Sequence, residues 1–278
     1  MFIADPCEVI RRTFEHVGYG YEIIQKQGRP DDEAIMRTRI KREVDDGRPV
    51  LAFGVIGPPD CCLITGYDDD GQVLIGWNFF QNDPIFSAGL EFEPEGYFRK
   101  RDWFKDTISV IAIGEKTSRL DPRERNRETL RWAIALATTP QVNGRHSGFE
   151  AYTAWADHLG DHEGFASLDV DQLRQRHQVH DITVGNLAEC RWYAHIFLSE
   201  MAKTEPAMAQ DLLAAAAEYD NEHTLMWKAW GVLGGNGHPQ AHIKLAEPEA
   251  RRQLQAIIQE ARQCDERAIQ HIRDALAR

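Results

Sequence analysis

The sequence has no hydrophobic run that approaches the roughly eighteen consecutive apolar residues of a membrane-spanning helix. It also lacks a stripe of clustered lysine and arginine. With 44 acidic against 32 basic side chains, the net charge is −12, and such a field repels phosphate backbones. Residues 1–6 lack the basic segment and apolar core of a secretory signal peptide. We therefore expect neither a membrane nor nucleic acid as a partner.

Cysteine is sparse, and no cysteine spacing resembles a disulfide framework or a zinc site. The five cysteines are Cys7, Cys61, Cys62, Cys190 and Cys264. Their number is odd and two are adjacent, so that these two cannot easily bridge each other. A reducing cytoplasm is the expected compartment.

What is present is ordinary globular composition, with 42% hydrophobic and 27% charged residues. The texture changes along the chain, and no internal repeat is visible. Residues 1–116 mix short apolar runs with turn residues, whereas residues 121–278 read as successive helices. The fold class predicted from this change is α+β, with a small antiparallel sheet in the first region and an all-helical second region.

In the first region, the apolar spacing predicts helices and strands in alternation. The expected elements are helices over 7–17 and 31–45, strands over 21–24, 61–67, 72–77 and 109–113, and an apolar run over 50–56. Gly18 should end the first helix. The acidic turn Asp68-Asp69-Asp70-Gly71 makes residues 61–77 the clearest hairpin in the chain.

In the second region, five helical segments are expected. They cover about 123–138, 147–159, 184–203, 206–232 and 247–277. Asp121-Pro122 is an N-cap followed by the proline favoured at the first helical position, and Pro248 serves the last helix in the same way. Residues 162–183 and 234–239 remain as linkers or pocket edges.

Cys7 stands in the first turn of its expected helix, where the helix dipole and free amide groups lower a thiol pKa. The alternative is a small apolar residue beside the core. The hairpin adds to the first interpretation, because its sequence LITGYDDDGQVLIGWN resembles that of papain-like cysteine peptidases of the bacteriocin-processing type. In those families the catalytic histidine begins the first strand, and the residue that orients it follows the second.

This resemblance assigns the nucleophile to Cys7, the histidine position to Asp60 and the orienting position to Asn78. Aspartate is a far weaker base than histidine, and its charge would raise a neighbouring thiol pKa. Thiol catalysis is therefore expected to be lost or rerouted. The residues that could replace the missing histidine as the base are His16, on the same expected helix as Cys7, and histidines of the second region.

The second region resembles the family of butirosin biosynthesis protein H, in segments such as ETLRWAIALA (128–137) and GFEAYTAWADHL (148–159). Further similar segments are CRWYAHIFLSEMA (190–202) and LLAAAAEYDNEHTLMWKAW (212–230). That family joins a papain-like domain to a helical partner. The namesake moves an acyl group from a carrier-protein thioester to an aminoglycoside amine, so a carrier protein is one partner that the resemblance implies.

Three side chains outside the thiol site are candidates for ligand binding. His146 stands in Gly144-Arg145-His146-Ser147, which reads as a glycine-flanked loop before a helix. Trp77 ends the second hairpin strand, and we expect both to line a cleft between the two regions. Arg191 lies in an aromatic-rich pair of helices and would border an aromatic pocket, where it would hold a carboxylate or phosphate or pair with an acidic neighbour. The aromatic residues around it, Trp192, Tyr193, Trp227 and Trp230 among them, are expected to be mainly core.

Three functions follow from these features. The first is a catalytically degenerate papain-like protein that binds a small metabolite in the cleft. The second is a cysteine-dependent acyltransferase or amide hydrolase of secondary metabolism that uses Cys7. The third is an assembly partner, with an exposed apolar patch and no deep cleft. No metal and no cofactor is predicted, and a second copy of the chain is a further partner considered.

Overall fold

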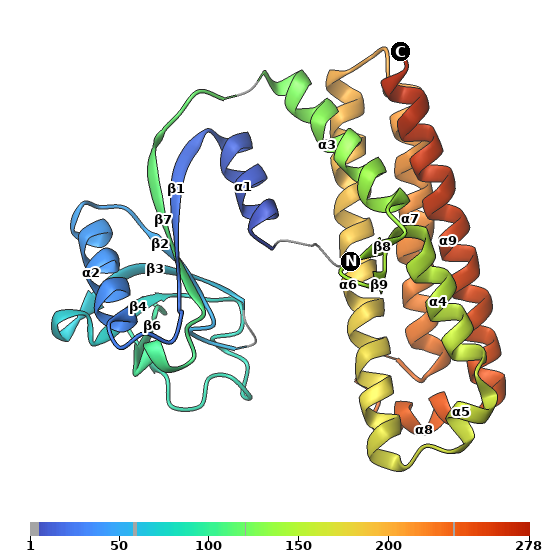
Figure 1. The fold of residues 1–278 in the computed structure, drawn as a ribbon, viewed down its shortest axis with the longest axis horizontal. Coiled ribbons are helices and arrows are strands. Elements are labelled where there is room, and N and C mark those ends of the chain that lie inside the picture. The colour runs from blue at the N-terminus through green and yellow to red at the C-terminus, as the bar shows by residue number, and fades with distance from the viewer. Residues whose placement is uncertain (1–5, 58–59, 120, 236) are drawn as a thin grey trace. The chain divides into compact units, whose positions relative to one another are not determined.

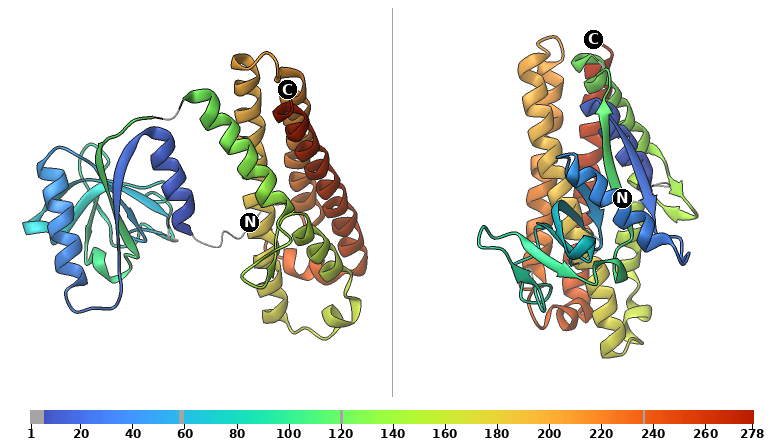
Figure 2. Two further views of the ribbon diagram at one scale, coloured as in Figure 1. Left: turned by 45° about the horizontal axis from the view of Figure 1, so that its top comes forward. Right: turned by 90° about the vertical axis from the view of Figure 1, so that its left-hand side faces the viewer.

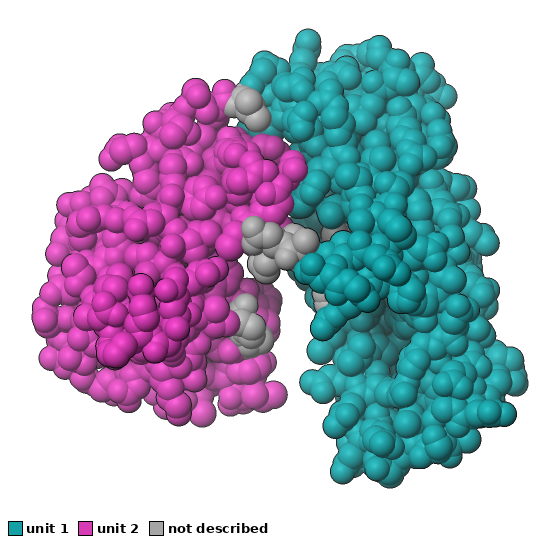
Figure 3. Space-filling model, in the orientation of Figure 1, with its two compact units in different colours: residues 1–6, 121–278 teal, residues 7–120 magenta. Residues whose placement is uncertain are grey.

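The computed structural model describes residues 6–57, 60–119, 121–235 and 237–278. Residues 7–120 form one compact unit and residues 121–278 belong to another, as the colours of Figure 3 show. The first contains the β-sheet and is called the sheet unit below. The second is almost entirely helical and is called the helical unit. The predicted α+β class is confirmed.

The sheet unit contains seven antiparallel strands in the order β1-β7-β2-β3-β4-β6-β5 (Figure 1). These strands are β1 (Tyr19–Gln25), β2 (Val50–Phe53), β3 (Cys61–Asp68), β4 (Val73–Trp77), β5 (Glu91–Phe92), β6 (Phe98–Arg101) and β7 (Ser109–Lys116). Strands β5 and β6 were not expected from the sequence. Their residues, EF and FRKR, lack the alternation of apolar and polar side chains that marks a half-buried strand.

The predicted hairpin over residues 61–77 is confirmed, with β3 and β4 joined by the short helix η1 (Asp69–Gly71). Its three aspartates are held by basic side chains from other elements, in the pairs Asp68–Arg99, Asp69–Arg101 and Asp70–Lys41. The backbone of Asp69 and of Asp70 is left-handed, with φ of 51° and 56°. The most distinctive part of the hairpin sequence therefore shapes and anchors a turn.

The two helices of the sheet unit lie on opposite faces of the sheet (Figures 1 and 2). α2 (Asp32–Asp45) buries Met36 and Ile40 in a core that includes Ile64. α1 (Pro6–Val17) packs at the β1 edge of the other face, where the ring of Phe14 stacks on Tyr21 with centroids 4.6 Å apart. A short helix, η2 (Trp103–Lys105), precedes β7.

The helical unit contains α3 (Pro122–Thr138), α4 (Gly148–Gly160), α5 (His162–Ala166), α6 (Val170–Thr204), α7 (Ala209–Val232), α8 (Ala241–Ala246) and α9 (Pro248–Leu276). The long helices α6, α7 and α9 run alternately up and down, and α3 and α4 follow each other along α9 (Figures 1 and 2). A small hairpin of β8 (Gln141–Val142) and β9 (Arg145–His146) separates α3 from α4.

The helix starts agree with the capping signals in the sequence. The Asp121 carboxylate accepts hydrogen bonds from two backbone N–H groups of α3, and Pro122 and Pro248 stand at the first positions of α3 and α9. Residues 162–183 were predicted as a linker or a pocket edge. The linker is wrong, because α5 and the first turns of α6 occupy the segment, whereas Asp181 and Ile182 do line a groove of the helical unit. A capping box formed by Asp169 and Gln172 starts α6 fourteen residues earlier than expected (184 − 170).

Among the residues that the structure describes, no helix has both the length and the apolar composition needed to span a membrane.

Candidate functional site

Cys7, the predicted nucleophile, lies in α1 beside the outermost strand of the sheet. Its Sγ accepts a hydrogen bond from Gln25 Nε2 at 3.7 Å. In the sheet register, Gln25 pairs with Ser109, Ser109 with Phe53, and Phe53 with Cys61. These three strand-to-strand steps separate the backbones of Gln25 and Cys61 by about 14 Å. Cys7 thus contacts the β1 edge, whereas Asp60 precedes Cys61 in the sheet interior.

Asn78, in the predicted orienting position, is fully buried at the end of β4. Its Nδ2 donates to the carbonyl of Cys61 at 3.2 Å, and its Oδ1 accepts from the backbone N–H of Phe80 at 2.8 Å. Its own N–H donates to Gln81 Oε1 at 3.0 Å. These contacts close the open end of the hairpin, so Asn78 has a clear structural role at this position.

Asp60, in the histidine position, accepts a hydrogen bond at its backbone carbonyl from Gly54 N–H, at 3.3 Å. Burial raises the pKa of the Cys61 thiol to about 11, and the charges of Cys62 and Asp60 add to this increase. Burial also raises the pKa of Cys62. The effect of Asp60 on nearby thiols is therefore opposite to the thiolate stabilisation that cysteine catalysis requires.

We predict a definite order of thiol alkylation by iodoacetamide. Cys61 and Cys264, whose pKa values burial raises to about 11, should react slowly at pH 8, since the thiolate is the reactive form. The exposed Cys190 should react first. Peptide mapping by mass spectrometry at pH 6 and pH 8 measures the order. We expect Cys7 to react no faster than Cys190 at pH 6, and rapid low-pH alkylation confined to Cys7 would restore the acyltransferase hypothesis.

The helical unit carries an open groove of about 550 Å³ between α6 and α7. Its wall is aromatic and largely solvent-facing, since Trp192 is 41% exposed, Tyr193 61% and Trp227 54%. The prediction that these side chains are mainly core is therefore wrong for these three. Single exposed aromatics are common on proteins, but several gathered in one groove mark a binding surface.

Hydrogen bonds hold the indole rings of the groove in place. Trp230 Nε1 donates to Asp181 Oδ1 at 2.7 Å, and Trp227 Nε1 donates to His223 Nε2 at 3.0 Å. His223 Nδ1 lies 2.8 Å from the carbonyl oxygen of Ala188, to which it can donate while Nε2 accepts from Trp227. The aromatic wall is consequently preorganised.

The charge of the groove is negative. Two carboxylates line it, Asp181 and Glu189, and no lysine or arginine is among the described residues that line it. Within the described parts of the chain, neither carboxylate forms an ion pair with lysine or arginine. Aromatic faces beside unpaired carboxylates are the surroundings that an organic cation prefers.

Arg191 does not line this groove, although it adjoins Trp192 in sequence. It is only 8% exposed and points into the bundle. Its Nε donates to Glu222 Oε2 at 2.7 Å and its Nη2 to Asp265 Oδ2 at 2.8 Å. Of the two predicted roles, Arg191 therefore takes the second, pairing with acidic neighbours. The hydroxyl of Tyr152 also bonds to Glu222, and these four residues are called the Arg191 cluster below.

Burial raises the pKa of Glu222 to about 8, against the opposing charge of Arg191. We therefore expect Glu222 to keep its proton at neutral pH. The Arg191 cluster then has one guanidinium facing one carboxylate, that of Asp265. The guanidinium also lies over the ring of Tyr219, 4.9 Å from its centroid. Such a buried, satisfied network is typical of a structural element that sets how helices pack.

His146 is on strand β9 rather than in a loop, paired with Gln141 across a two-residue turn. The turn is Asn143-Gly144, with φ of 49° and 73°, which is the strongest short hairpin signal in a sequence. His146 is exposed there. Trp77, 48% exposed, lies in the sheet unit opposite Leu63 of β3. The cleft predicted to join His146 and Trp77 stays a prediction.

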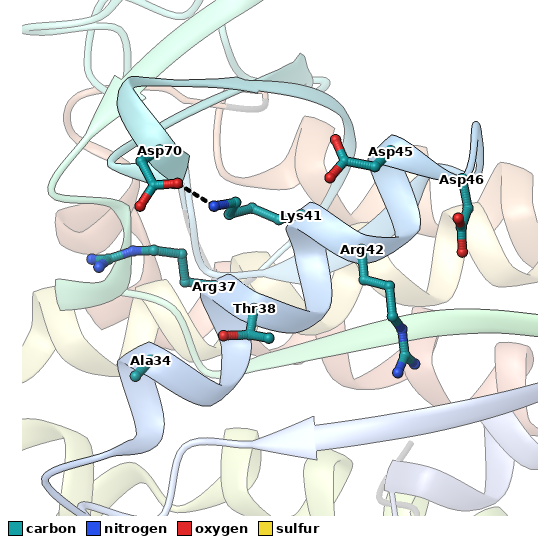
Figure 4. A pocket seen from close by; sticks show the side chains of 8 residues that line it. All are labelled: Ala34, Arg37, Thr38, Lys41, Arg42, Asp45, Asp46 and Asp70. Atoms are coloured by element: carbon teal, nitrogen blue, oxygen red, sulfur yellow. Dashed lines mark hydrogen bonds and ion pairs between the residues drawn. The ribbon is translucent and has the colours of Figure 1, made fainter.

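A second groove, on α2 of the sheet unit, is lined by charged side chains of both signs (Figure 4). Lys41 points toward Asp70, with which it pairs, whereas Arg42 points away from both. Arg37 pairs with Glu33. Because these basic groups diverge and are already paired, they do not form a focused anion site.

Two comparisons with known proteins find no relative of this chain. A scan against models of protein families finds none that matches the chain, and a search of curated proteins finds no matching entry. Among the residues that the structure describes, no group of three or more His, Cys, Asp and Glu side chains has an arrangement that could hold a metal ion.

Proposed function

We propose that this chain is a non-catalytic binding protein, whose helical unit holds an amine-bearing small molecule in the groove between α6 and α7. The observation that supports this proposal is the combination of two hydrogen-bonded tryptophans, of which Trp227 is exposed, with two lining carboxylates that form no ion pair with lysine or arginine among the described residues. The sequence predicted a metabolite bound in a cleft between the two regions. We propose that the metabolite binds instead to a surface within the helical unit.

A cation suits the groove better than a neutral or anionic ligand. Tryptophan is the best aromatic partner for an ammonium group, and one such contact contributes about 0.5–2 kcal/mol. The rings of Trp227 and Trp230 are already oriented by His223 and Asp181. Little conformational entropy is then lost when a ligand binds. An anion would meet two carboxylates and no compensating positive charge among the described lining residues.

A non-catalytic role agrees with the surroundings of the predicted thiol site. Asp60 replaces the histidine that the papain-like resemblance calls for, and the pKa of the adjacent Cys61 is raised, chiefly by burial and further by the charges of Cys62 and Asp60. Asn78 is engaged with the backbone of the hairpin. We propose that the sheet unit is a papain-like scaffold that has lost thiol chemistry, and that the protein acts in the cytoplasm.

Choline and its uncharged isostere 3,3-dimethyl-1-butanol test the proposed function. We expect choline to bind with millimolar affinity and the alcohol at least ten times more weakly, because only choline gains the cation–π contacts. Tryptophan fluorescence and isothermal titration calorimetry measure both. Trp227→Ala should weaken choline binding about tenfold, the loss expected for about 1.4 kcal/mol of contact energy.

The matched control is Trp77→Ala, which removes a similarly exposed tryptophan, 48% against 54%, from the sheet unit. It should leave choline binding unchanged. Loss of binding in Trp77→Ala but not in Trp227→Ala would return the site to the hairpin end. Equal binding of choline and the alcohol, or no binding of either, would contradict the proposed function. Circular dichroism and Trp227→Phe guard against misfolding of the alanine variant.

A further inference from the structure

We infer that the ligand of this groove is a linear aliphatic diamine whose two ammonium groups contact Asp181 and Glu189. This inference rests on the proposed function and specifies its ligand. It starts from the sequence spacing along α6, where Asp181, Gly185 and Glu189 stand four residues apart and all line the groove. Residues four apart share a helix face, so the three positions form one stripe with glycine between the two carboxylates.

The spacing sets the length of the ligand. Eight residues separate Asp181 from Glu189 (189 − 181), which corresponds to about 12 Å along a helix that rises 1.5 Å per residue. An extended eight-carbon chain places its terminal nitrogens about 11 Å apart, given C–C bonds of about 1.5 Å. A diammonium ion of this length can contact both carboxylates at once, whereas a four-carbon diamine is too short.

The surface between the carboxylates suits a chain of methylene groups. A Cβ atom placed on Gly185 would lie 3.2 Å from Cζ2 of Trp230, so glycine allows the indole to pack against α6 at the middle of the stripe. Trp230 and Trp227 contact each other with ring centroids 4.9 Å apart, and both line the groove opposite α6. Apolar aromatic surface therefore connects the two charged ends.

Both carboxylates have acceptor positions available for an ammonium group. Asp181 receives the Trp230 indole N–H at Oδ1, and each carboxylate oxygen can accept two hydrogen bonds. Glu189 is exposed on the rim. An ammonium group has three donors, so each end of the diamine can bond to a carboxylate and keep contact with water. Two such ends on one chain bind more tightly than either alone, because the second contact is intramolecular.

Calorimetric titration of the full chain with a series of amines tests the inference. The diamines are 1,4-diaminobutane, 1,8-diaminooctane and 1,12-diaminododecane, and the controls are n-octylamine and 1,8-octanediol. We expect 1,8-diaminooctane to bind at least ten times more tightly than n-octylamine and 1,4-diaminobutane. Asp181→Asn and Glu189→Gln should each reduce that affinity to the level of n-octylamine. Glu200→Gln, on the same helix and paired with Lys203, should have no effect.

The outcomes separate this inference from the proposed function. If n-octylamine and 1,8-diaminooctane bind equally, or if affinity does not depend on diamine length, the groove still binds amines and the two-point inference is overturned. If Asp181→Asn and Glu189→Gln leave the preference for the eight-carbon diamine intact, the assigned carboxylates are wrong. If no amine binds at all, the proposed function fails together with the inference.

Discussion

Replacement of Arg191 by methionine is expected to lower the free energy of unfolding of the helical unit by about 3–5 kcal/mol, the usual penalty for removing one partner of a buried ion pair. The variant keeps much of the side-chain volume but leaves Glu222 and Asp265 without their guanidinium, and these carboxyl groups are 0% and 2% exposed. Urea unfolding followed by circular dichroism at 222 nm, which reports chiefly on the helices, measures the loss.

A second substitution identifies the source of that loss. In Arg191→Met, the Asp265 carboxylate stays buried without its 2.8 Å contact to the guanidinium. Adding Asp265→Asn removes the charge, so the double variant should recover at least half of the lost stability. If Arg191→Met is as stable as the parent protein, or if the double variant is less stable than Arg191→Met, the description of the cluster as a buried ion pair is wrong.

The same cluster predicts a pH dependence of the parent protein. The folded chain keeps the Glu222 proton up to a pKa of about 8, whereas the unfolded chain releases it near the ordinary value of 4.5. Between these values the folded state binds more protons than the unfolded state, so this group's contribution to stability is lost as pH rises from about 4.5 to 8, by at most about 1.4 kcal/mol per pH unit. Glu222→Gln cannot titrate and should flatten the decline between pH 6.5 and 8.5.

Replacement of Arg251 by leucine should have the other large effect, a loss of about 3 kcal/mol, because hydrogen bonds from a charged group contribute about 1.5–3 kcal/mol each. Arg251 is 1% exposed and binds the ends of two helices. Its Nε donates to the carbonyl of Leu159 at 3.2 Å, and its Nη1 donates to those of Leu245 and Ala246 at 3.2 and 2.5 Å. These carbonyls belong to the last turns of α4 and α8 and have no partner further along their helices.

Arg252 offers a control for this substitution within the same helix. It is half-exposed and pairs with Glu249 one turn away, so Arg252→Leu should change the free energy of unfolding by less than about 0.5 kcal/mol. Arg251→Lys keeps the charge without the planar fork and should fall between the parent and Arg251→Leu. Equal effects of Arg251→Leu and Arg252→Leu in urea unfolding would show that the buried fork does not stabilise the bundle.

The groove between α6 and α7 shows how the candidate site differs from what the sequence suggested. Arg191, Trp192 and Tyr193 follow one another in the chain. The sequence predicted an anion site or an acidic partner for Arg191, and a mainly core position for the aromatic residues. In the structure Arg191 is buried with acidic partners, whereas both aromatic residues are exposed. Successive residues of a helix point about 100° apart, so which of them faces inward depends on where the neighbouring helices lie.

The sequence by itself determined the elements whose causes are local. The spacing of apolar residues and Gly18 defined the first helix, and the acidic turn defined the hairpin over residues 61–77. Asp121 and Pro122 located the start of α3. Each of these signals acts through hydrogen bonds or backbone angles within a few residues, and for this reason they could be identified without knowledge of the fold.

The tertiary structure alone decided what depends on contacts between distant residues. Strand β6, with the sequence FRKR, exists because it pairs with β4, although its charged side chains carry no strand pattern. Arg191 is buried because Glu222 and Asp265 approach it from α7 and α9. The groove likewise requires that α7 bring Trp227 and Trp230 beside α6. Partners 31 and 74 residues away in the chain leave no mark on local periodicity, since burial is a property of the packed bundle.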